Sequence, residues 1–383
     1  MKNLNSCNKL PTLDGWRAIA ISLVLFSHGS ESIQNVSNTY VFLNLSIIKT
    51  FGLLGVKLFF GLSGFLITNR LINEEKIYGV ISLKFFYIRR SFRILPASIL
   101  FLIVTGLLSL NGIINITLYR WYRTFLFLSN YTTADNSWYL GHFWSLAVEE
   151  HFYFIWPGFF LFLSCNRKRI FFILATAALV FLWRAIDFKF HITASTPAIF
   201  WGRTDIQADS ILWGVLIAFI YDNNLWNKRL VLLFSFKYSL TIILIILFGF
   251  EFLPNFDWKI NFILLTIKAI VIPLVIIGSV INNLSLFSRI LESYLFRKIG
   301  ALSYSIYLWQ QLFLVWNEHR NPSFSFLQYF PYNYLATLIC AALCMILVEK
   351  PCINLGKKIV RLIKIKSNQC ELLKRKNTRT LVS

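Results

Sequence analysis

The sequence predicts an all-α integral membrane protein with about ten transmembrane helices and both termini in the cytoplasm. Hydrophobic residues make up 57% of the 383 residues and charged residues only 14%, whereas about 25% of the residues of a soluble domain are charged. Runs of about twenty apolar residues, the length that crosses the hydrocarbon of a bilayer, recur along the whole chain. Basic residues gather in alternate connections between these runs, and this asymmetry predicts the orientation.

The apolar runs define ten expected spans in chain order. They cover residues 13–31, 48–70, 92–111, 144–163, 170–187, 205–221, 229–249, 260–282, 298–317 and 327–348. Polar residues interrupt the first, sixth and ninth runs, which are therefore the least regular of the set. The stretch 112–128 is interpreted as a partly buried or re-entrant segment rather than a span.

The orientation follows from the distribution of lysine and arginine in the short loops. With ten spans, the loops on the side of the termini contain Lys76, Lys84, Arg89, Arg90, Arg167, Lys168, Arg169, Lys228, Arg229, Lys237, Arg289, Arg297 and Lys298. The opposite loops contain fewer, namely Lys49, Arg120, Arg123, Lys189, Arg203, Lys259 and Arg320. Cytoplasmic loops carry the excess of basic residues, so the termini are expected in the cytoplasm. The net charge of +21 then reflects topology and contact with lipid headgroups, and we expect no nucleic-acid partner.

The chain divides into a transmembrane domain, residues 1–350, and a basic cytoplasmic tail, residues 351–383. The tail is expected to lie along the anionic inner leaflet because it is rich in lysine and arginine. The longest outer loop, about 112–143, is too short for a separate catalytic domain, so any chemistry must take place in the membrane body. No cysteine spacing is typical of a metal site, and no metal is expected.

Arg17 and His28 share one apolar run and lie eleven residues apart. On a helix this spacing is three turns plus about 20°, which places both side chains on one face and roughly 16 Å apart. Ionisable residues inside a membrane span are costly and commonly mark a functional site. The pair therefore predicts a polar path through the bilayer. An equally open interpretation of His28 is a hydrogen-bonded histidine close to the membrane surface.

Arg90 and Arg93 are three residues apart and share a face at the cytoplasmic end of the third span. The simpler interpretation is positive-inside anchoring, which suits Arg90 better than Arg93 because Arg93 already borders an apolar run. Together with Arg17, the two would form an anion site that faces the cytoplasm. The planar fork of arginine is well matched to phosphate.

The fourth span begins with a polar segment in which Glu149 and Glu150 enter an apolar helix. Ser145, Glu149 and Tyr153 recur at a spacing of four residues and so share a face. Glu149 and His28 are expected at similar depths in the outer half of the membrane. A carboxylate beside an imidazole orients the ring and makes it a better base, so we expect this pair to act together.

Other charged residues have a structural and a functional interpretation of similar weight. Arg203 and Asp209 open the sixth span, either as a solvated helix start favoured by the helix dipole or as part of an acceptor site. Arg184 and Lys268 are expected to extend toward the membrane surface. The residues expected to bind the acceptor or to support the site are Asp14, Ser145, Glu150, Tyr153, Arg203 and Asp209.

Six segments in order resemble the acyltransferase 3 family of integral membrane acyltransferases, across about residues 12–351. They are Leu13–Ala18 with His28, Gly55–Ile67, Tyr87–Pro96, Trp144–Tyr153 with Trp156–Pro157, Ser303–Trp309 and Glu349–Pro351. The chain departs from the family pattern at Lys57, where an acidic residue is common, and at Gln310, where a histidine is common. Some members carry a further secreted domain, and this chain resembles the single-component, sugar O-acetyltransferase form.

The resemblance implies transfer of an acetyl or other acyl group from cytoplasmic acetyl-CoA to a sugar hydroxyl. The acceptor class it implies is a bacterial surface polysaccharide, such as the O-antigen of lipopolysaccharide, and the location is the bacterial cytoplasmic (inner) membrane. It further implies that His28 is the catalytic histidine and that Glu149 is the acidic residue of the fourth-span motif. By the same resemblance, Arg17, Arg90 and Arg93 hold the phosphates of CoA.

Direct transfer assisted by His28 is the expected mechanism, and a covalent acyl-serine on Ser63 or Ser145 is the alternative. The expected partners are membrane lipids, acetyl-CoA and a glycan or lipid-linked glycan. A different class of protein also fits ten spans with charges inside them, namely a transporter or flippase of a glycan or lipid-linked sugar. Transporters often show paired halves with broken helices in matching positions, and no such repeat is found in the sequence.

Overall fold

The computed structural model describes residues 10–37, 45–131, 138–190, 192–193, 202–236, 238–252, 258–282 and 285–380. Within these residues the chain is helical and contains no strand. The α-helices are α1 (Pro11–Ser37), α2 (Leu45–Tyr78), α3 (Leu83–Leu110), α4 (Leu118–Phe125), α5 (Phe143–Phe162), α6 (Asn166–Phe190), α8 (Thr204–Asp222), α9 (Asn224–Ser235), α10 (Ser239–Gly249), α11 (Trp258–Ile281), α12 (Leu286–Leu291), α13 (Tyr294–Phe313), α14 (Tyr332–Cys344) and α15 (Lys350–Thr380). The shorter turns are η2 (Ser129–Tyr131), η3 (Trp138–Leu140), η4 (Asn317–His319), η5 (Pro322–Gln328) and η6 (Met345–Glu349).

Six helical segments of the described chain are long and apolar enough to cross a membrane. They are Ile47–Tyr78, Leu83–Leu110, Asn166–Phe190, Thr204–Asp222, Phe262–Ile281 and Tyr332–Ile365. The pair α9 and α10 makes a seventh if it counts as one span. The expected number of ten is therefore not confirmed, although the chain is a multi-pass membrane protein by these spans.

The remaining three expected spans are helices, but they fall outside this apolar set. Helices α1, α5 and α13 cover most of the runs 13–31, 144–163 and 298–317, although α13 ends at Phe313. Their sequences contain charged, imidazole and amide groups that lower the hydropathy of any window.

The expected span 229–249 is not one continuous helix. It consists of α9 and α10, whose axes are bent by 84°. Asn223 caps the start of α9, since its side-chain oxygen accepts hydrogen bonds from the backbone of Leu225 and Trp226. An apolar run of this length is equally compatible with a straight and a broken helix, so the bend was not visible in the sequence.

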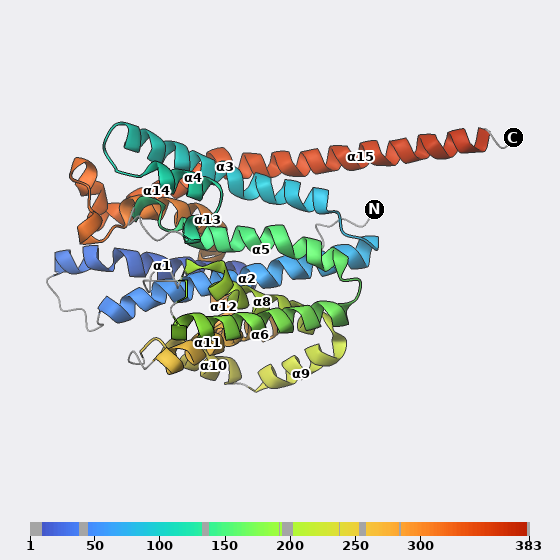
Figure 1. Ribbon diagram of the computed structural model, residues 1–383, viewed down its shortest axis with the longest axis horizontal. Helices are drawn as coiled ribbons and strands as arrows, with labels where there is room; N and C mark the ends of the chain where they lie inside the picture. Colours follow the sequence, from blue (N-terminus) through green and yellow to red (C-terminus); the bar gives the residue numbers. More distant parts are fainter. Residues whose placement is uncertain are drawn as a thin grey trace.

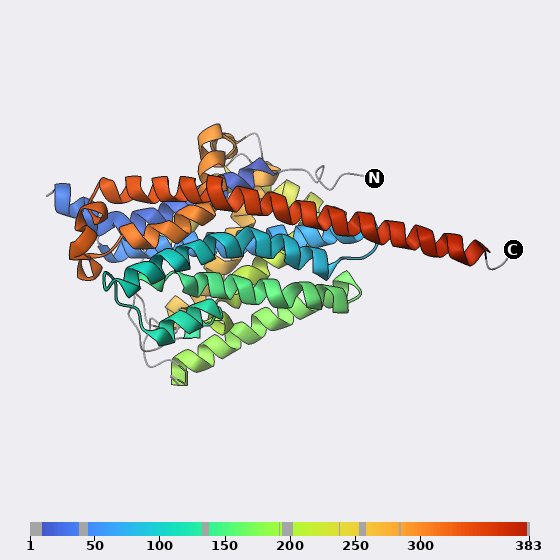
Figure 2. The ribbon, with the colours of Figure 1, turned by 90° about the horizontal axis from the view of Figure 1, so that it is seen from above.

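Helix α2 lies at the centre of the bundle, and α1, α5, α8 and α11 pack against it (Figures 1 and 2). Leu54, Leu58 and Leu62 recur every four residues on α2 and are almost fully buried, so they form one stripe that faces its neighbours. In the apolar stretch of α2, 72% of the residues are buried inside the protein, compared with 28% in α3 and 28% in α6. The outer helices therefore present most of their apolar surface to the surroundings, as lipid-facing helices do.

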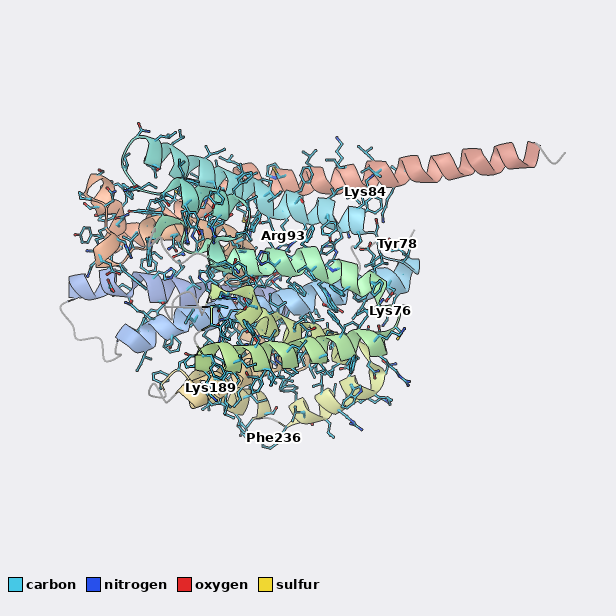
Figure 3. All side chains as sticks on the ribbon, in the orientation of Figure 1. Lys76, Tyr78, Lys84, Arg93, Lys189 and Phe236 are labelled. Atoms are coloured by element: carbon cyan, nitrogen blue, oxygen red, sulfur yellow. The ribbon has the colours of Figure 1, made fainter. Side chains whose placement is uncertain are left out.

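The start of α1 and the end of α15 point toward the same end of the bundle (Figures 1 and 2). Lys76 and Lys84 lie near that end, whereas Lys189 lies near the other (Figure 3). This arrangement matches the expected division of these three lysines between the two sets of loops. The side of the membrane that each end faces stays a prediction.

The tail residues form a helix that continues the last span. Helix α14 passes through the π-helical turn η6 into α15, which projects beyond the bundle along its long axis (Figure 1). The sequence predicted a tail that lies along the inner leaflet, starting at residue 351. The helix runs through that position without a break, and the apolar span extends to Ile365. The division of the chain at residue 350 and the placement of the tail along the inner leaflet stay predictions.

Glycines allow α2 and α8 to cross in close contact. A Cβ atom added to Gly214 of α8 would collide with the backbone oxygen of Gly61 on α2. Likewise, a Cβ atom on Gly64 would collide with the backbone oxygen of Ile211. Small residues permit such close approach of helices inside membranes. Because Ser63 lies between the two α2 glycines, this crossing also fixes the position of Ser63.

Replacement of Gly214 by alanine is expected to destabilise the protein by about 1–3 kcal/mol, because the backbone of Gly61 cannot move aside as a side chain can. Thermal unfolding in detergent micelles measures the change. Gly158→Ala on α5 is the control, since open space surrounds that position. It is expected to be neutral or to stabilise by up to about 1 kcal/mol. Equal melting temperatures for the two variants would refute the tight crossing.

Candidate active site

One pocket collects the three arginines that the sequence placed in an anion site. Helices α1, α2, α3, α5 and α13 contribute its walls. The lining residues are Arg17, Val56, Phe59, Phe60, Ser63, Arg90, Arg93, Ile94, Ser145, Leu146, Glu149, Tyr153, Ser303, Tyr304 and Tyr307. Thus Arg17 of α1 and the neighbouring Arg90 and Arg93 of α3 face one cavity together with a single carboxylate. Below, this cavity is called the arginine pocket.

Glu149 is the centre of a hydrogen-bonded group in the arginine pocket. The Ser63 hydroxyl donates to Glu149 Oε1 at 2.9 Å, and the Tyr153 hydroxyl donates to Oε2 at 2.8 Å. The Tyr153 and Ser63 oxygens are themselves 2.6 Å apart. Arg90 Nη2 lies 3.9 Å from Oε2 and completes the set with an opposite charge. The expected shared face of Glu149 and Tyr153 on α5 is therefore the face that meets α2 and α3.

The guanidinium of Arg90 also stacks on the ring of Tyr153, with 3.3 Å between its carbon Cζ and the ring centroid. A cation over an aromatic face is attracted by the ring quadrupole. Arg90 is thus held by a ring and by a carboxylate at once. Arg17 is held differently, by an ion pair of 3.1 Å with Asp14 one turn earlier on α1. Asp14 therefore supports an arginine of the pocket and is not one of its lining residues.

His28 lies outside the lining of the arginine pocket. Its Nδ1 atom is 2.7 Å from Oε1 of Gln310 on α13. Two indole rings flank the imidazole, with centroid distances of 5.3 Å to Trp138 and 6.4 Å to Trp316. His28 is thus held between an amide and two aromatic rings.

The expected pairing of His28 with Glu149 is absent from the structure. Glu149 is occupied by Ser63, Tyr153 and Arg90, while the imidazole has Gln310 as its partner. Similar depth on two helices permits a contact but does not determine it, because the helices also have to face each other. In the sequence, only the departure from the family pattern distinguishes Gln310 from its neighbours.

His142 connects the surroundings of His28 and the arginine pocket. Its side chain is buried, and neither ring nitrogen has a hydrogen-bond partner among the described residues. The ring packs on Tyr307 at 5.6 Å, and Tyr307 shares a 2.6 Å hydrogen bond with Ser145 inside the pocket. The His142 ring also lies near His28. The polar fourth-span segment begins at His142, and its i, i+3 spacing to Ser145 was a signal that the sequence interpretation did not use.

Glu349 is a second residue of the site region to which the sequence interpretation gave no role. It ends the π-helical turn η6, is buried, and accepts a 2.8 Å hydrogen bond from Ser305. Its charge interacts with that of Arg93. Such turns occur often at functional sites because they shift the direction of side chains. The signal in the sequence was the family-like segment Glu349–Pro351.

Two expected acceptor residues, Arg203 and Glu150, do not line the arginine pocket. Arg203 precedes α8 and forms an ion pair of 2.8 Å with Asp205. Glu150 lines a neighbouring cavity between α3 and α5, together with His151 and Arg90. Of the expected supporting residues, Ser145 and Tyr153 therefore line the pocket, whereas Arg203 and Glu150 do not.

Asp209 belongs to a separate buried charge cluster. It forms an ion pair of 2.6 Å with Arg184, and the two side chains are each only 2% exposed. Lys268 and Glu251 form a second pair of 2.7 Å, and the buried Lys57 interacts electrostatically with both pairs. The expected extension of Arg184 to the membrane surface is therefore wrong. Lys57 departs from the family pattern where these charges gather.

A family model and several curated proteins that resemble this chain are all described as acyltransferases. A family model described as an acyltransferase domain matches residues 10–349. The chain is 32% identical over 322 residues to a Staphylococcus aureus (strain COL) protein that is provisionally named an O-acetyltransferase. It is 28% identical to the peptidoglycan O-acetyltransferase OatA of Listeria monocytogenes and 29% identical to the O-acetyltransferase OatA of Staphylococcus aureus.

These matches cover most of this chain but only part of each relative. They include 78%, 78% and 82% of this chain, and 50%, 48% and 52% of the three relatives in the same order. The chain thus spans about half the length of the curated relatives it matches. No solved structure matches the chain.

Removal of the charge of Asp209 is expected to leave Arg184 buried without its partner. Breaking a buried ion pair from one side costs about 3–5 kcal/mol. Thermal unfolding of Asp209→Asn in detergent measures the loss, with Asp205→Asn as the control because its partner Arg203 sits at a more exposed helix start. The control is expected to lose at most about 1 kcal/mol. If Asp209→Asn were no less stable than Asp205→Asn, the structural role of the buried pair would be wrong.

Proposed function

The chain belongs to the acyltransferase 3 family, and from this membership we propose that it moves an acetyl group from acetyl-CoA to a hydroxyl group of a cell-surface glycan. Family and relatives identify it as an O-acyltransferase enzyme, which decides against the transporter interpretation. The proposal adds the donor, the acceptor class and the roles of the residues. The single observation that supports it best is the gathering of three arginines around one cavity.

The arginine pocket is the proposed donor site. Three guanidinium groups and one carboxylate line it, so positive charge is in excess. Arg17, Arg90 and Arg93 would hold phosphate oxygens of CoA, since the guanidinium fork makes paired hydrogen bonds to such groups. Arg17 and His28 are about 16 Å apart along α1. The extended arm of CoA would bridge this distance and bring the thioester toward His28.

His28 is the proposed general base. It takes the proton from the acceptor hydroxyl while the hydroxyl oxygen attacks the thioester carbonyl. The new C–O bond forms as the C–S bond breaks, and the leaving thiolate receives the proton back from the imidazolium. The products are therefore the acetylated glycan and free CoA. Positioned proton transfer of this kind contributes about 10²–10⁴-fold in rate.

Glu149 receives a different role from the one expected. Since it does not contact His28, we assign it to the arginine pocket, where it positions Arg90 and Tyr153. One observation favours the acyl-serine alternative, namely that the Ser63 hydroxyl donates to Glu149. In that mechanism the carboxylate would take the serine proton, and labelled acetyl groups would remain on the protein in the absence of acceptor.

The proposed acceptor is a bacterial surface polysaccharide, with the O-antigen of lipopolysaccharide as the first candidate and the bacterial cytoplasmic membrane as the location. A second candidate comes from the Listeria monocytogenes relative, whose name states peptidoglycan as its substrate. Ser145 and Tyr153 are proposed to support the reaction from the pocket, and Asp14 through Arg17. The distribution of label between polysaccharide and peptidoglycan fractions distinguishes the candidates.

Inverted membrane vesicles supplied with radiolabelled acetyl-CoA test the reaction. His28→Ala is expected to lower the transfer of label to extracted glycan by about 10²–10⁴-fold, because the general base is lost. His151→Ala is the control, since its ring bonds to Thr204 and is not among the residues that line the arginine pocket. Wild-type yield from the His28→Ala vesicles would exclude His28 as the base.

The donor site is tested on α3, where Arg93 lies inside the bundle and Lys84 near its end (Figure 3). Arg93→Gln is expected to raise the KM for acetyl-CoA by about 10–100-fold, since a hydrogen bond to a charged group contributes about 1.5–3 kcal/mol. Lys84→Gln removes the same charge from the same helix and is expected to leave KM unchanged. A KM for Arg93→Gln within twofold of wild type would refute the proposed donor site.

A further inference from the structure

A chain of buried amides begins at His28. The imidazole Nδ1 lies 2.7 Å from Gln310 Oε1, and Gln310 Nε2 donates to Gln311 Oε1 at 2.9 Å. Gln311 Nε2 then donates to the backbone oxygen of Trp138 at 2.6 Å. Both glutamine side chains are fully or almost fully buried, so no exchange with bulk water competes with these bonds.

The bond to the backbone oxygen of Trp138 determines which way round both side-chain amides lie. A backbone carbonyl can only accept a hydrogen bond, so Gln311 has to present its NH₂ group to Trp138. Its oxygen then faces Gln310, which has to donate in turn, and the oxygen of Gln310 is left to face the imidazole. Reversal of either amide would bring two acceptors into contact. Such a contact leaves buried polar atoms unpaired at a cost of about 1–3 kcal/mol each.

We propose that Gln310 and Gln311 hold His28 in the tautomer with the proton on Nδ1, so that Nε2 keeps the lone pair that accepts the hydroxyl proton. The catalytic step rests on the proposed function, whereas the tautomer follows from the hydrogen bonds alone. Among the described residues no hydrogen bond is found at Nε2, the atom to which the proposal assigns the lone pair. Gln310 and Gln311 are positioning residues, because they act through His28.

Trp138 contacts both Gln311 and His28. Its indole Nε1 donates to the backbone oxygen of Gln311 at 3.0 Å, while its own backbone oxygen accepts from the Gln311 side chain. Its ring also stands edge-on against the imidazole, 5.3 Å from it. Trp138 therefore fixes the orientation of the Gln310 and Gln311 amides and also that of the His28 imidazole.

The tautomer is measured directly by ¹⁵N NMR of histidine-labelled protein in detergent or lipid. The chain has only five histidines, and the spectrum of His28→Asn assigns the His28 signals by difference. Wild type is expected to show a protonated Nδ1 and an unprotonated Nε2 at a pH where the ring is neutral. A proton on Nε2 would overturn the proposal, and this result needs no variant that might misfold.

The amide chain is tested with Gln310→Met, which keeps the size of the side chain but removes the acceptor. His28 is expected to lose its single tautomer in this variant. Gln328→Met is the control, because Gln328 is equally buried and bonds to backbone groups of Leu312 and Asn321 instead. An unchanged tautomer in Gln310→Met would show that the amide does not set it.

Activity separates a positioning role from a purely structural one. Gln310→Met is expected to lower kcat by tenfold or more with an unchanged KM for acetyl-CoA. A reversed tautomer costs about 10⁴-fold in the serine-protease triad. Gln310→Glu still accepts from Nδ1 and is expected to retain more activity than Gln310→Met. The acid limb of the pH–activity profile of Gln310→Glu should move to higher pH, because a carboxylate stabilises the protonated His28 ring.

Both substitutions break the hydrogen bond to Gln311. A purely structural role of Gln310 therefore predicts that kcat falls equally in the two variants. Equal losses of kcat would refute the positioning role. The NMR measurement uses neither donor nor acceptor. A confirmed tautomer without acetyl transfer would therefore contradict the proposed function alone, whereas transfer with the opposite tautomer would contradict only the positioning role.

Discussion

A polar group inside the bundle has to find its partner within the protein, because hydrocarbon supplies none. This constraint explains the arrangement of the site more fully than any single motif. Glu149 is bonded to two hydroxyl groups and lies close to an arginine, and His28 is bonded to a glutamine that is itself bonded onward. The donor pocket and the base are thus built from side chains that also satisfy one another.

The same constraint decides how much of the fold could be predicted from the sequence. Apolar runs predicted the positions of the helices well, since burial in lipid or protein requires them. The number of crossings could not be predicted equally well, because α1 and α5 carry Arg17, His28 and Glu149 and are less apolar than a typical span. Similarly, the bend between α9 and α10 depends on packing around a run that is apolar throughout.

Within the site, residues on one helix were predictable and contacts between helices were not. Periodicity placed Glu149 and Tyr153 on one face, and the family-like segments indicated the three arginines that line the pocket. Depth along a helix suggested that Glu149 meets His28, but depth does not define the neighbour across the bundle. The actual partner, Gln310, is 282 residues away in the sequence, and only the packing of α13 against α1 brings it near.

The ion pair between Arg184 on α6 and Asp209 on α8 has a consequence for biogenesis. A lone arginine or aspartate costs up to about 2.5–3.5 kcal/mol during insertion by the translocon, the upper value applying at the centre of a helix. The two helices follow each other in the chain and neutralise each other when they are adjacent. Pairing of α6 with α8 thus lowers the cost of placing either charge inside the membrane, so release of the two helices into lipid together is expected to be more favourable than release of each one alone.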